Sequence, residues 1–194
     1  MTTHDLIIVG GGPAGASAAV FAARAGLRTL VIDADQGFTR RAMIYNHLGL
    51  PDGVTGPELV ELGRRHAVKS GAEWIDGSVK ELVPGVDGVG VVTESGERYD
   101  ARDVLLAVGV RTSVAETAGL TPRPGTEPRI ASVLDVDRDG RTSVDHIWAA
   151  GTAADQSVHT IVTAGDGARV AINIISAHKG ERYVDHDVLP APKK

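Results

Sequence analysis

A glycine-rich turn between an apolar strand and a helix of small residues limits the possible folds of this chain most strongly. The turn is residues 10–15, Gly-Gly-Gly-Pro-Ala-Gly. Gly10 permits a tight turn, Gly12 lets a pyrophosphate approach the backbone, and Gly15 lets the helix pack on the strand. The exposed N–H groups at the helix start then bind the anion. We therefore predict a strand–helix–strand unit that binds a dinucleotide.

An acidic residue ends the second strand, residues 28–33, at the distance from the glycines where a carboxylate binds an adenosine ribose. This residue is Asp33, and Asp35 is close enough to take the same role. A carboxylate disfavours a 2′-phosphate, so FAD or NAD fits better than NADP. A solvated aspartate at a strand end is the alternative interpretation of Asp33.

The composition argues against several classes of function. A chain of 194 residues, 42% of them hydrophobic, can bury one good core. A net charge of −5 with no basic stripe argues against a nucleic-acid partner. The absence of cysteine excludes disulphides, thiol catalysis and cysteine-ligated metals. The apolar run at residues 6–9 is too short for a signal or membrane helix, so we expect a cytoplasmic protein without a membrane partner.

The rest of the chain alternates strand and helix patterns. We expect a loop at residues 34–54 and a helix from an N-cap at Thr55 to about residue 70. Further strands are expected at residues 72–75, 79–83, 89–93, 98–101, 103–108, 130–136 and 147–150, and a last helix at residues 157–178. The strands at residues 79–83, 89–93 and 98–101, with the turns between them, have the pattern of an antiparallel meander. Residues 103–108 have the pattern of a buried parallel strand.

Further motifs follow the glycine turn in a fixed order. They are Asp33, residues 46–49 with 55–59, residues 106–109, residues 141–151 and residues 164–167. In this order they resemble the FAD domain of the low-molecular-weight thioredoxin reductases and their pyridine nucleotide–disulphide relatives. The resemblance covers nearly all of residues 4–180. It implies a single doubly wound, Rossmann-like α/β domain at residues 1–180 with a three-stranded antiparallel β-meander, FAD as cofactor, and a flexible tail at residues 181–194.

The resemblance also implies roles for individual residues. It directs the N–H groups at the start of the last helix toward the flavin N1–C2=O edge, where a helix N-terminus stabilises negative charge. It brings His47 and His159 near the flavin, as proton donors at N5 or as a neutral wall of the pocket. The implied cofactor-binding residues are Gly10, Gly12, Pro13 and Ala14 at the pyrophosphate, Asp33 at the ribose, Val79 at the adenine, Arg41 and Asn46 toward the flavin, Ala107 and Gly109 beside the cofactor, and Gly151, Thr152, His159, Thr160 and Ile161 at the flavin end.

Three departures from the family pattern bear on function. Only residues 110–146 lie where relatives insert an NADPH domain, and the family's Cys-x-x-Cys is missing. Thr152 stands where the family has the Asp that binds the flavin ribityl chain, and a neutral partner forgoes the stronger charge-assisted hydrogen bond. Asp155 is a candidate substitute for that Asp.

Other residue patterns predict structural roles. Residues 135–140 begin like a calcium loop, but His146 replaces the closing Glu, so we interpret them as an Asp-rich hairpin turn and predict no metal site. We expect solvated or helix-capping positions for His66 and His178, and core positions for Trp74 and Trp148.

Together these observations predict a flavoprotein of the thioredoxin-reductase type. We expect a flavin-dependent oxidoreductase or electron-transfer component without its own NADPH domain or disulphide. Its electrons would come from a protein redox partner, a diffusing reductant or an unidentified small-molecule substrate, and a homodimer is a further expectation. The alternatives are a non-catalytic FAD- or nucleotide-binding module or subunit of a larger complex, and a pocket that holds NAD(H).

Overall fold

A computed structural model describes residues 4–187 and 189. Most strands belong to one sheet in the order β5-β2-β1-β8-β7-β6, and β9 pairs with β8 beside this path. Short 3-10 helices carry the label η. Along the chain the elements are β1 (His4–Val9), α1 (Pro13–Arg24), β2 (Thr29–Asp33), η1 (Phe38–Arg41), β3 (Met43–Ile44), β4 (Val54–Thr55), α2 (Gly56–Lys69), β5 (Glu73–Asp76), β6 (Val79–Gly85), β7 (Gly88–Thr93), β8 (Arg98–Leu106), η2 (Thr112–Ala118), β9 (Ile147–Ala149), η3 (Gly151–Ala154) and α3 (Thr160–Lys179).

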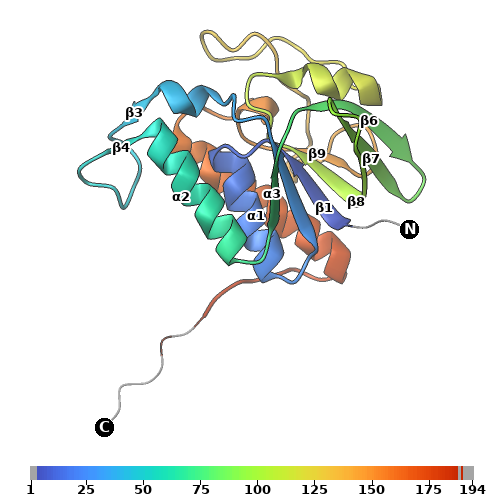
Figure 1. Ribbon diagram of the computed structural model, residues 1–194, viewed down its shortest axis with the longest axis horizontal. Helices are drawn as coiled ribbons and strands as arrows, with labels where there is room; N and C mark the ends of the chain where they lie inside the picture. The colour runs from blue at the N-terminus through green and yellow to red at the C-terminus, as the bar shows by residue number, and fades with distance from the viewer. Residues whose placement is uncertain (1–3, 188, 190–194) are drawn as a thin grey trace.

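The central strand β1 supplies side chains to two separate cores. Leu6 and Ile8 pack with the small residues of α1 and with α3, whereas Ile7 and Val9 pack with the meander and η2. This alternation follows from the strand geometry, in which successive side chains point to opposite faces. Figure 1 shows α1, α2 and α3 together on one side of the parallel strands, and β6, β7 and η2 on the other. The predicted α/β fold with an antiparallel meander is confirmed.

One long strand, β8, replaces the two strands predicted at residues 98–101 and 103–108. Its first half pairs antiparallel with β7, and its second half pairs parallel with β9, while β1 runs parallel along its other side. Ala101 pairs with both Val89 and His4, so the chain stays extended where a break was expected. The prediction of a break failed because Arg102 does not favour a turn. Its exposed side chain continues the alternation of buried and exposed residues along the strand.

Other predicted boundaries need correction. Residues 130–136 are not a strand, since Val133 forms only an isolated bridge with Arg123. The expected loop at residues 34–54 contains η1, β3 and part of β4. The cap at Thr55 is confirmed, because its hydroxyl accepts a hydrogen bond from the Glu58 N–H at 3.3 Å.

Helices α1 and α3 cross at very short range because small residues meet there. A Cβ on Gly167 of α3 would lie 2.0 Å from the carbonyl oxygen of Ala14 in α1, and a Cβ on Gly151 would lie 2.9 Å from the Ala14 Cβ. Real Cβ atoms do not approach backbone this closely, so larger residues would push the helices apart. The crossing thus holds the start of α1 beside the turn that follows β9.

A buried polar cluster fixes the far end of α3, away from the glycine turn. Asp103 accepts hydrogen bonds from the Trp148 indole N–H at 2.8 Å and, through its other oxygen, contacts His178 Nε2 at 2.7 Å. Burial raises the pKa of Asp103, but these hydrogen bonds and the nearby histidines outweigh it and hold the pKa below its usual value. The prediction that His178 is solvated or capping was wrong, because its side chain is only 7% exposed. Trp148 is in the core, as predicted, and His66 is exposed.

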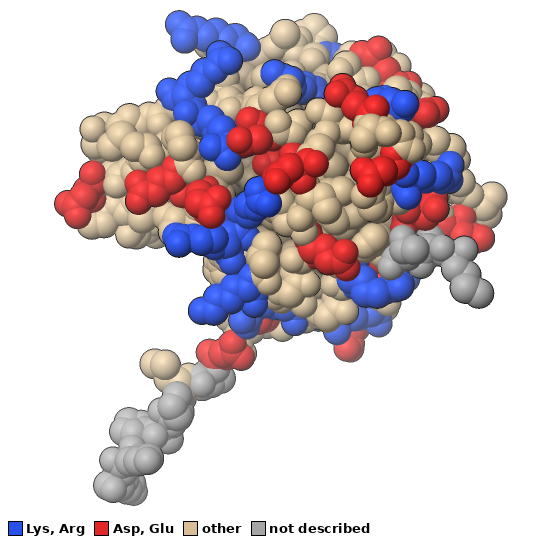
Figure 2. All heavy atoms as spheres, viewed as in Figure 1, with Lys and Arg blue, Asp and Glu red and all other residues tan. Residues whose placement is uncertain are grey.

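Acidic and basic side chains are mixed over the visible face of the molecule (Figure 2). Among the described residues, no helix is both long and apolar enough to cross a membrane. At the end of the chain, Arg24 of α1 binds Asp185 and Asp187. Residues 188 and 190–194 of the predicted tail lie outside the described part of the chain.

Candidate functional site

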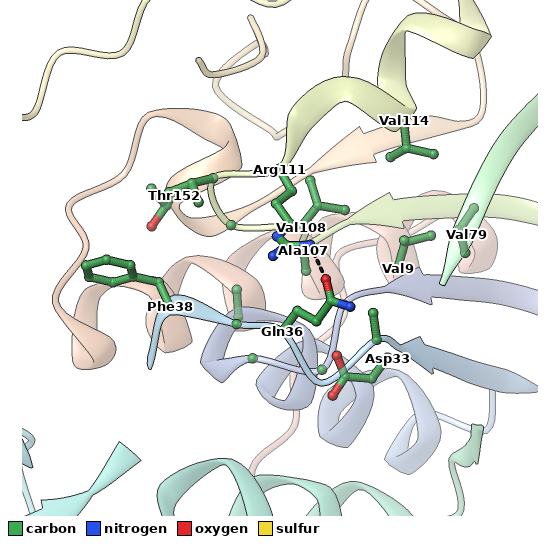
Figure 3. A pocket seen from close by; sticks show the side chains of 18 of the residues that line it. Val9, Asp33, Gln36, Phe38, Val79, Ala107, Val108, Arg111, Val114 and Thr152 are labelled. Carbon is green, nitrogen blue, oxygen red and sulfur yellow. Dashed lines mark hydrogen bonds between the residues drawn. The ribbon is translucent and has the colours of Figure 1, made fainter. Parts of the chain in front are cut away.

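A cavity of about 340 Å³ opens where β1, β2 and β8 end beside the start of α1 (Figure 3). Ligands in open α/β sheets bind at this edge, outside the carboxyl ends of the strands. The residues that line it are Val9, Gly10, Gly11, Gly12, Pro13, Ala14, Ile32, Asp33, Ala34, Gln36, Gly37, Phe38, Thr39, Gly77, Ser78, Val79, Glu94, Ala107, Val108, Gly109, Val110, Arg111, Ser113, Val114, Ala150, Thr152, Val158 and Thr163.

The glycine turn forms the floor of this cavity. Gly10 has φ +100°, and a Cβ there would lie 2.5 Å from the Ala107 carbonyl oxygen. A Cβ on Gly15 would lie 1.9 Å from the Gly10 oxygen, so both positions exclude larger residues. Gly12, the N-cap of α1, differs: no described heavy atom lies within 4 Å of where its Cβ would stand. The cavity is therefore open beside Gly12, at the end of α1 where backbone N–H groups lack partners within the helix.

Asp33 lines the cavity at the end of β2. The alternative acid, Asp35, forms an ion pair with Arg40 and is not part of the described cavity lining. Behind the turn, Trp74 of β5 packs against Gly11, where a Cβ would lie 2.2 Å from the indole ring. Trp74 is likewise outside the described lining, which agrees with the predicted packing role.

The opposite wall comes from the meander and from the end of β8. The Gly77 N–H donates to the Asp33 carbonyl at 2.9 Å, so the chain enters β6 beside β2 and places Val79 in the cavity. A register shift follows Val79 in the pairing with β7. Ala107 and Gly109 continue this wall, and their role beside a cofactor stays a prediction. Apolar side chains and glycine backbone thus form this wall of the cavity.

The start of α3 reaches the cavity only in part. Thr152, Val158 and Thr163 line it, whereas His159, Thr160, Ile161 and the turn residue Gly151 are not in its described lining. Gly151 instead donates its N–H to the buried Asp166 carboxylate at 2.7 Å. The flavin-binding role of these residues stays a prediction.

Each of the two candidate histidines contacts a hydroxyl near the start of α3. His47 Nδ1 is 2.9 Å from the Thr160 hydroxyl oxygen, and His159 Nδ1 is 2.7 Å from the Ser157 hydroxyl oxygen. Neither ring is in the described cavity lining. Arg41 and Asn46, on the same long segment as His47, are exposed and also stand outside it. The histidines are thus bonded to different hydroxyls, and their catalytic role stays a prediction.

Asp155 is turned away from the cavity. One carboxylate oxygen accepts hydrogen bonds from the Thr126 N–H and hydroxyl, both at 3.0 Å, and the other pairs with Arg123. The hydrogen bond from the Thr126 N–H lowers the pKa of Asp155 most strongly. The idea that Asp155 replaces the missing acid at Thr152 is therefore not supported by its position.

The Asp-rich segment forms a turn, as predicted. Asp137 accepts hydrogen bonds from the N–H groups of Asp139 and Arg141, both at 2.9 Å. The Arg141 guanidinium also pairs with Asp139, and Arg123 pairs with Asp135. No cluster of three or more potential metal-ligating side chains occurs among the described residues.

Sequence reasoning missed polar residues at the cavity mouth. Gln36 follows β2 and Arg111 precedes η2, and the guanidinium of Arg111 donates a hydrogen bond to the Gln36 side-chain oxygen (Figure 3). Glu94 and the half-exposed Phe38 also line the cavity. The only signal for these residues was their position after strand ends, because loops at that edge surround the ligand site in such folds.

Comparisons with known proteins agree with this fold and site. The family described as pyridine nucleotide-disulphide oxidoreductase matches residues 4–69 and 53–168. The bifunctional thioredoxin reductase/thioredoxin of Mycobacterium leprae is 36% identical over 61% of this chain and 26% of its own length. The thioredoxin reductase of Bacillus subtilis is 39% identical over 55% of this chain and 34% of its own length.

A solved thioredoxin reductase structure from Gloeobacter violaceus superposes with a TM-score of 0.80 at 19% identity, covering 96% of this chain and 99% of that one. The chain belongs to the pyridine nucleotide-disulphide oxidoreductase family and is thioredoxin reductase-like. It spans about a third or less of the length of the first curated relatives it matches, from 26% to 35%.

Proposed function

We propose that this chain binds FAD and acts as the flavin-carrying part of an oxidoreductase. The observation that carries the proposal is the open space in front of Gly12, bounded by the uncapped start of α1. A helix start that faces a cavity, with an acid at the end of the next strand, fits a dinucleotide diphosphate and its ribose. Family membership supports FAD as the dinucleotide.

In this proposal, different residues of the cavity bind different parts of the dinucleotide. The N–H groups near Gly12 and Ala14 bind the diphosphate, Asp33 accepts hydrogen bonds from the ribose, and Val79 packs on the adenine. Thr152 offers a neutral hydroxyl near the ribityl chain, so we expect weaker retention than an aspartate would provide. A bound flavin supplies the redox chemistry, while the protein orients it and excludes water.

The source of electrons is a further part of the proposal. Residues 110–146 are all described and contain η2 without any strand, which supports the proposal that this segment carries no second dinucleotide-binding unit. The sequence contains no cysteine to carry electrons onward. We therefore propose that electrons reach and leave the flavin through a separate protein, a diffusing reductant or a substrate bound beside it.

Titration of the purified full chain with FAD tests this proposal. We expect the yellow flavin absorbance to remain with the protein after gel filtration, and to be lost in a Gly12→Asp control that fills the open space. A colourless wild-type protein that takes up no added FAD would refute the proposal. Uptake of NADH in place of FAD would instead identify an NAD(H) pocket.

A non-catalytic nucleotide-binding module is the second candidate. Thr152 in place of an acid and the lack of cysteine favour it. Anaerobic mixing of the FAD-loaded protein with NADH, NADPH and reduced ferredoxin separates the two candidates. Bleaching of the flavin by any donor supports the oxidoreductase, and no bleaching by all three supports the module.

A further inference from the structure

Arg111 supplies the positive charge among the side chains of the described cavity lining. Asp33, Glu94 and Arg111 carry the charged side chains of the described lining, and Arg111 alone among these is cationic. Its guanidinium is bonded to the neutral side-chain amide of Gln36. A neutral acceptor binds an arginine more weakly than an anion does. The bond to Gln36 is therefore one that a phosphate can replace with a gain in energy.

The backbone around Arg111 is firmly positioned. Its N–H donates to the Val108 carbonyl at 3.1 Å, which closes the turn after β8. The next residue, Thr112, is 2% exposed and its hydroxyl lies 2.6 Å from that of Ser132. Figure 3 shows the Arg111 side chain extending from this turn toward Gln36 on the opposite loop, across the cavity. The side chain thus links two loops that both line the cavity.

We propose that Arg111 binds the diphosphate of the dinucleotide, and that Gln36 holds its guanidinium over the cavity until the ligand arrives. This inference rests on the proposed function. It places the Arg111 cation on one side of the diphosphate and the α1 N–H groups on the other. Arginine suits the role because its planar donors match phosphate oxygens two at a time. Gln36 is a resting partner that the phosphate displaces.

The competing explanation is that the hydrogen bond between Arg111 and Gln36 has only a structural role. In that case Arg111 and Gln36 would act as a pair that shapes the cavity, and loss of either would affect every ligand alike. The two explanations differ in their dependence on phosphate, so ligands with and without phosphate separate them.

The test measures dissociation constants of the full chain for FAD, ADP, adenosine and riboflavin, with Arg111→Gln, Arg111→Lys and Gln36→Ala. We expect Arg111→Gln to weaken FAD and ADP binding about ten- to a hundredfold, the range of a hydrogen bond to a charged group. Adenosine and riboflavin binding should change less than about twofold, since they lack the phosphates. Arg111→Lys should restore part of the loss, and Gln36→Ala should leave FAD affinity equal or higher.

Two results would overturn the inference while the proposed function stands. One is FAD and ADP binding by Arg111→Gln equal to that of the wild type. The other is an equal loss for all four ligands in both Arg111→Gln and Gln36→Ala. A wild-type chain that binds neither FAD nor ADP would overturn the proposed function and this inference together.

Discussion

The two helix starts next to the cavity, those of α1 and α3, present the same backbone groups in opposite surroundings. In front of α1 stands Gly12, with open space where a side chain would be. The start of α3 has no side-chain cap either, but protein side chains lie beside it: the Thr160 hydroxyl contacts His47, and the Val158 N–H, just before the helix, donates to Glu127 at 3.1 Å. Hydrogen bonds from Ser157 and Val158 hold the pKa of Glu127 below its usual value. The two helix starts therefore differ in how they border the cavity, because Pro13 and Ala14 of α1 line it, whereas of α3 only Thr163 does so in the described lining.

The largest expected effect comes from placing the same charge at both helix starts. Gly12→Asp puts a carboxylate where the diphosphate belongs, and we expect FAD affinity to fall more than about a hundredfold. Stability should be unchanged or higher, because Asp is a good N-cap and meets no neighbour. Ile161→Asp, in the first turn of α3, should reduce FAD affinity less than about threefold. Equal losses in the two variants, measured by FAD titration, would mean that both helix starts bind the cofactor.

The second prediction concerns the place where the two helices cross. Gly167→Ala forces a methyl group against the Ala14 carbonyl, so we expect a loss of about 3 kcal/mol in the free energy of unfolding. Gly165→Ala is the matched control, because no described heavy atom lies within 4 Å of its Cβ position. It should stabilise α3 by about 0.5–1 kcal/mol through helix propensity. Urea denaturation measures both, and similar values for the two variants would show that the crossing tolerates a wider separation.

The smallest effect is expected at the far end of α3, which tests whether this end is held independently of the cavity. Asp103→Asn removes the charge that contacts His178, and we expect a loss of about 1.5 kcal/mol at neutral pH. The pKa of Asp103 is lowered in the folded state, so its contribution is present above about pH 4 and is lost as the pH falls through the folded pKa.

Urea denaturation between neutral pH and acid checks the sign. Wild type and Asp103→Asn should differ most above about pH 4 and converge below it. A constant difference across this range would show that the charge of Asp103 is not the stabilising feature. FAD affinity should be the same in both proteins, because Asp103 is not part of the described cavity lining.

The glycine turn and the acid after β2 could be predicted because their signals are local. Gly10 is required by its own backbone conformation, φ +100°, and Gly15 by the Gly10 carbonyl five residues away. The break within β8 was predicted wrongly, since pairing with three neighbouring strands keeps that segment extended. The solvated role for His178 was wrong for a similar reason: its partner Asp103 is 75 residues away.

The sequence alone determined the class of fold, the floor of the cavity and the absence of thiol chemistry, because these depend on short spacings and on composition. Only the tertiary structure decided which helix start lines the cavity, that Asp155 turns away, and that Arg111 is bonded to Gln36. These outcomes depend on side chains brought together by the sheet from distant segments. A spacing along the chain carries no record of such contacts, because they arise only when the strands pair and the helices pack.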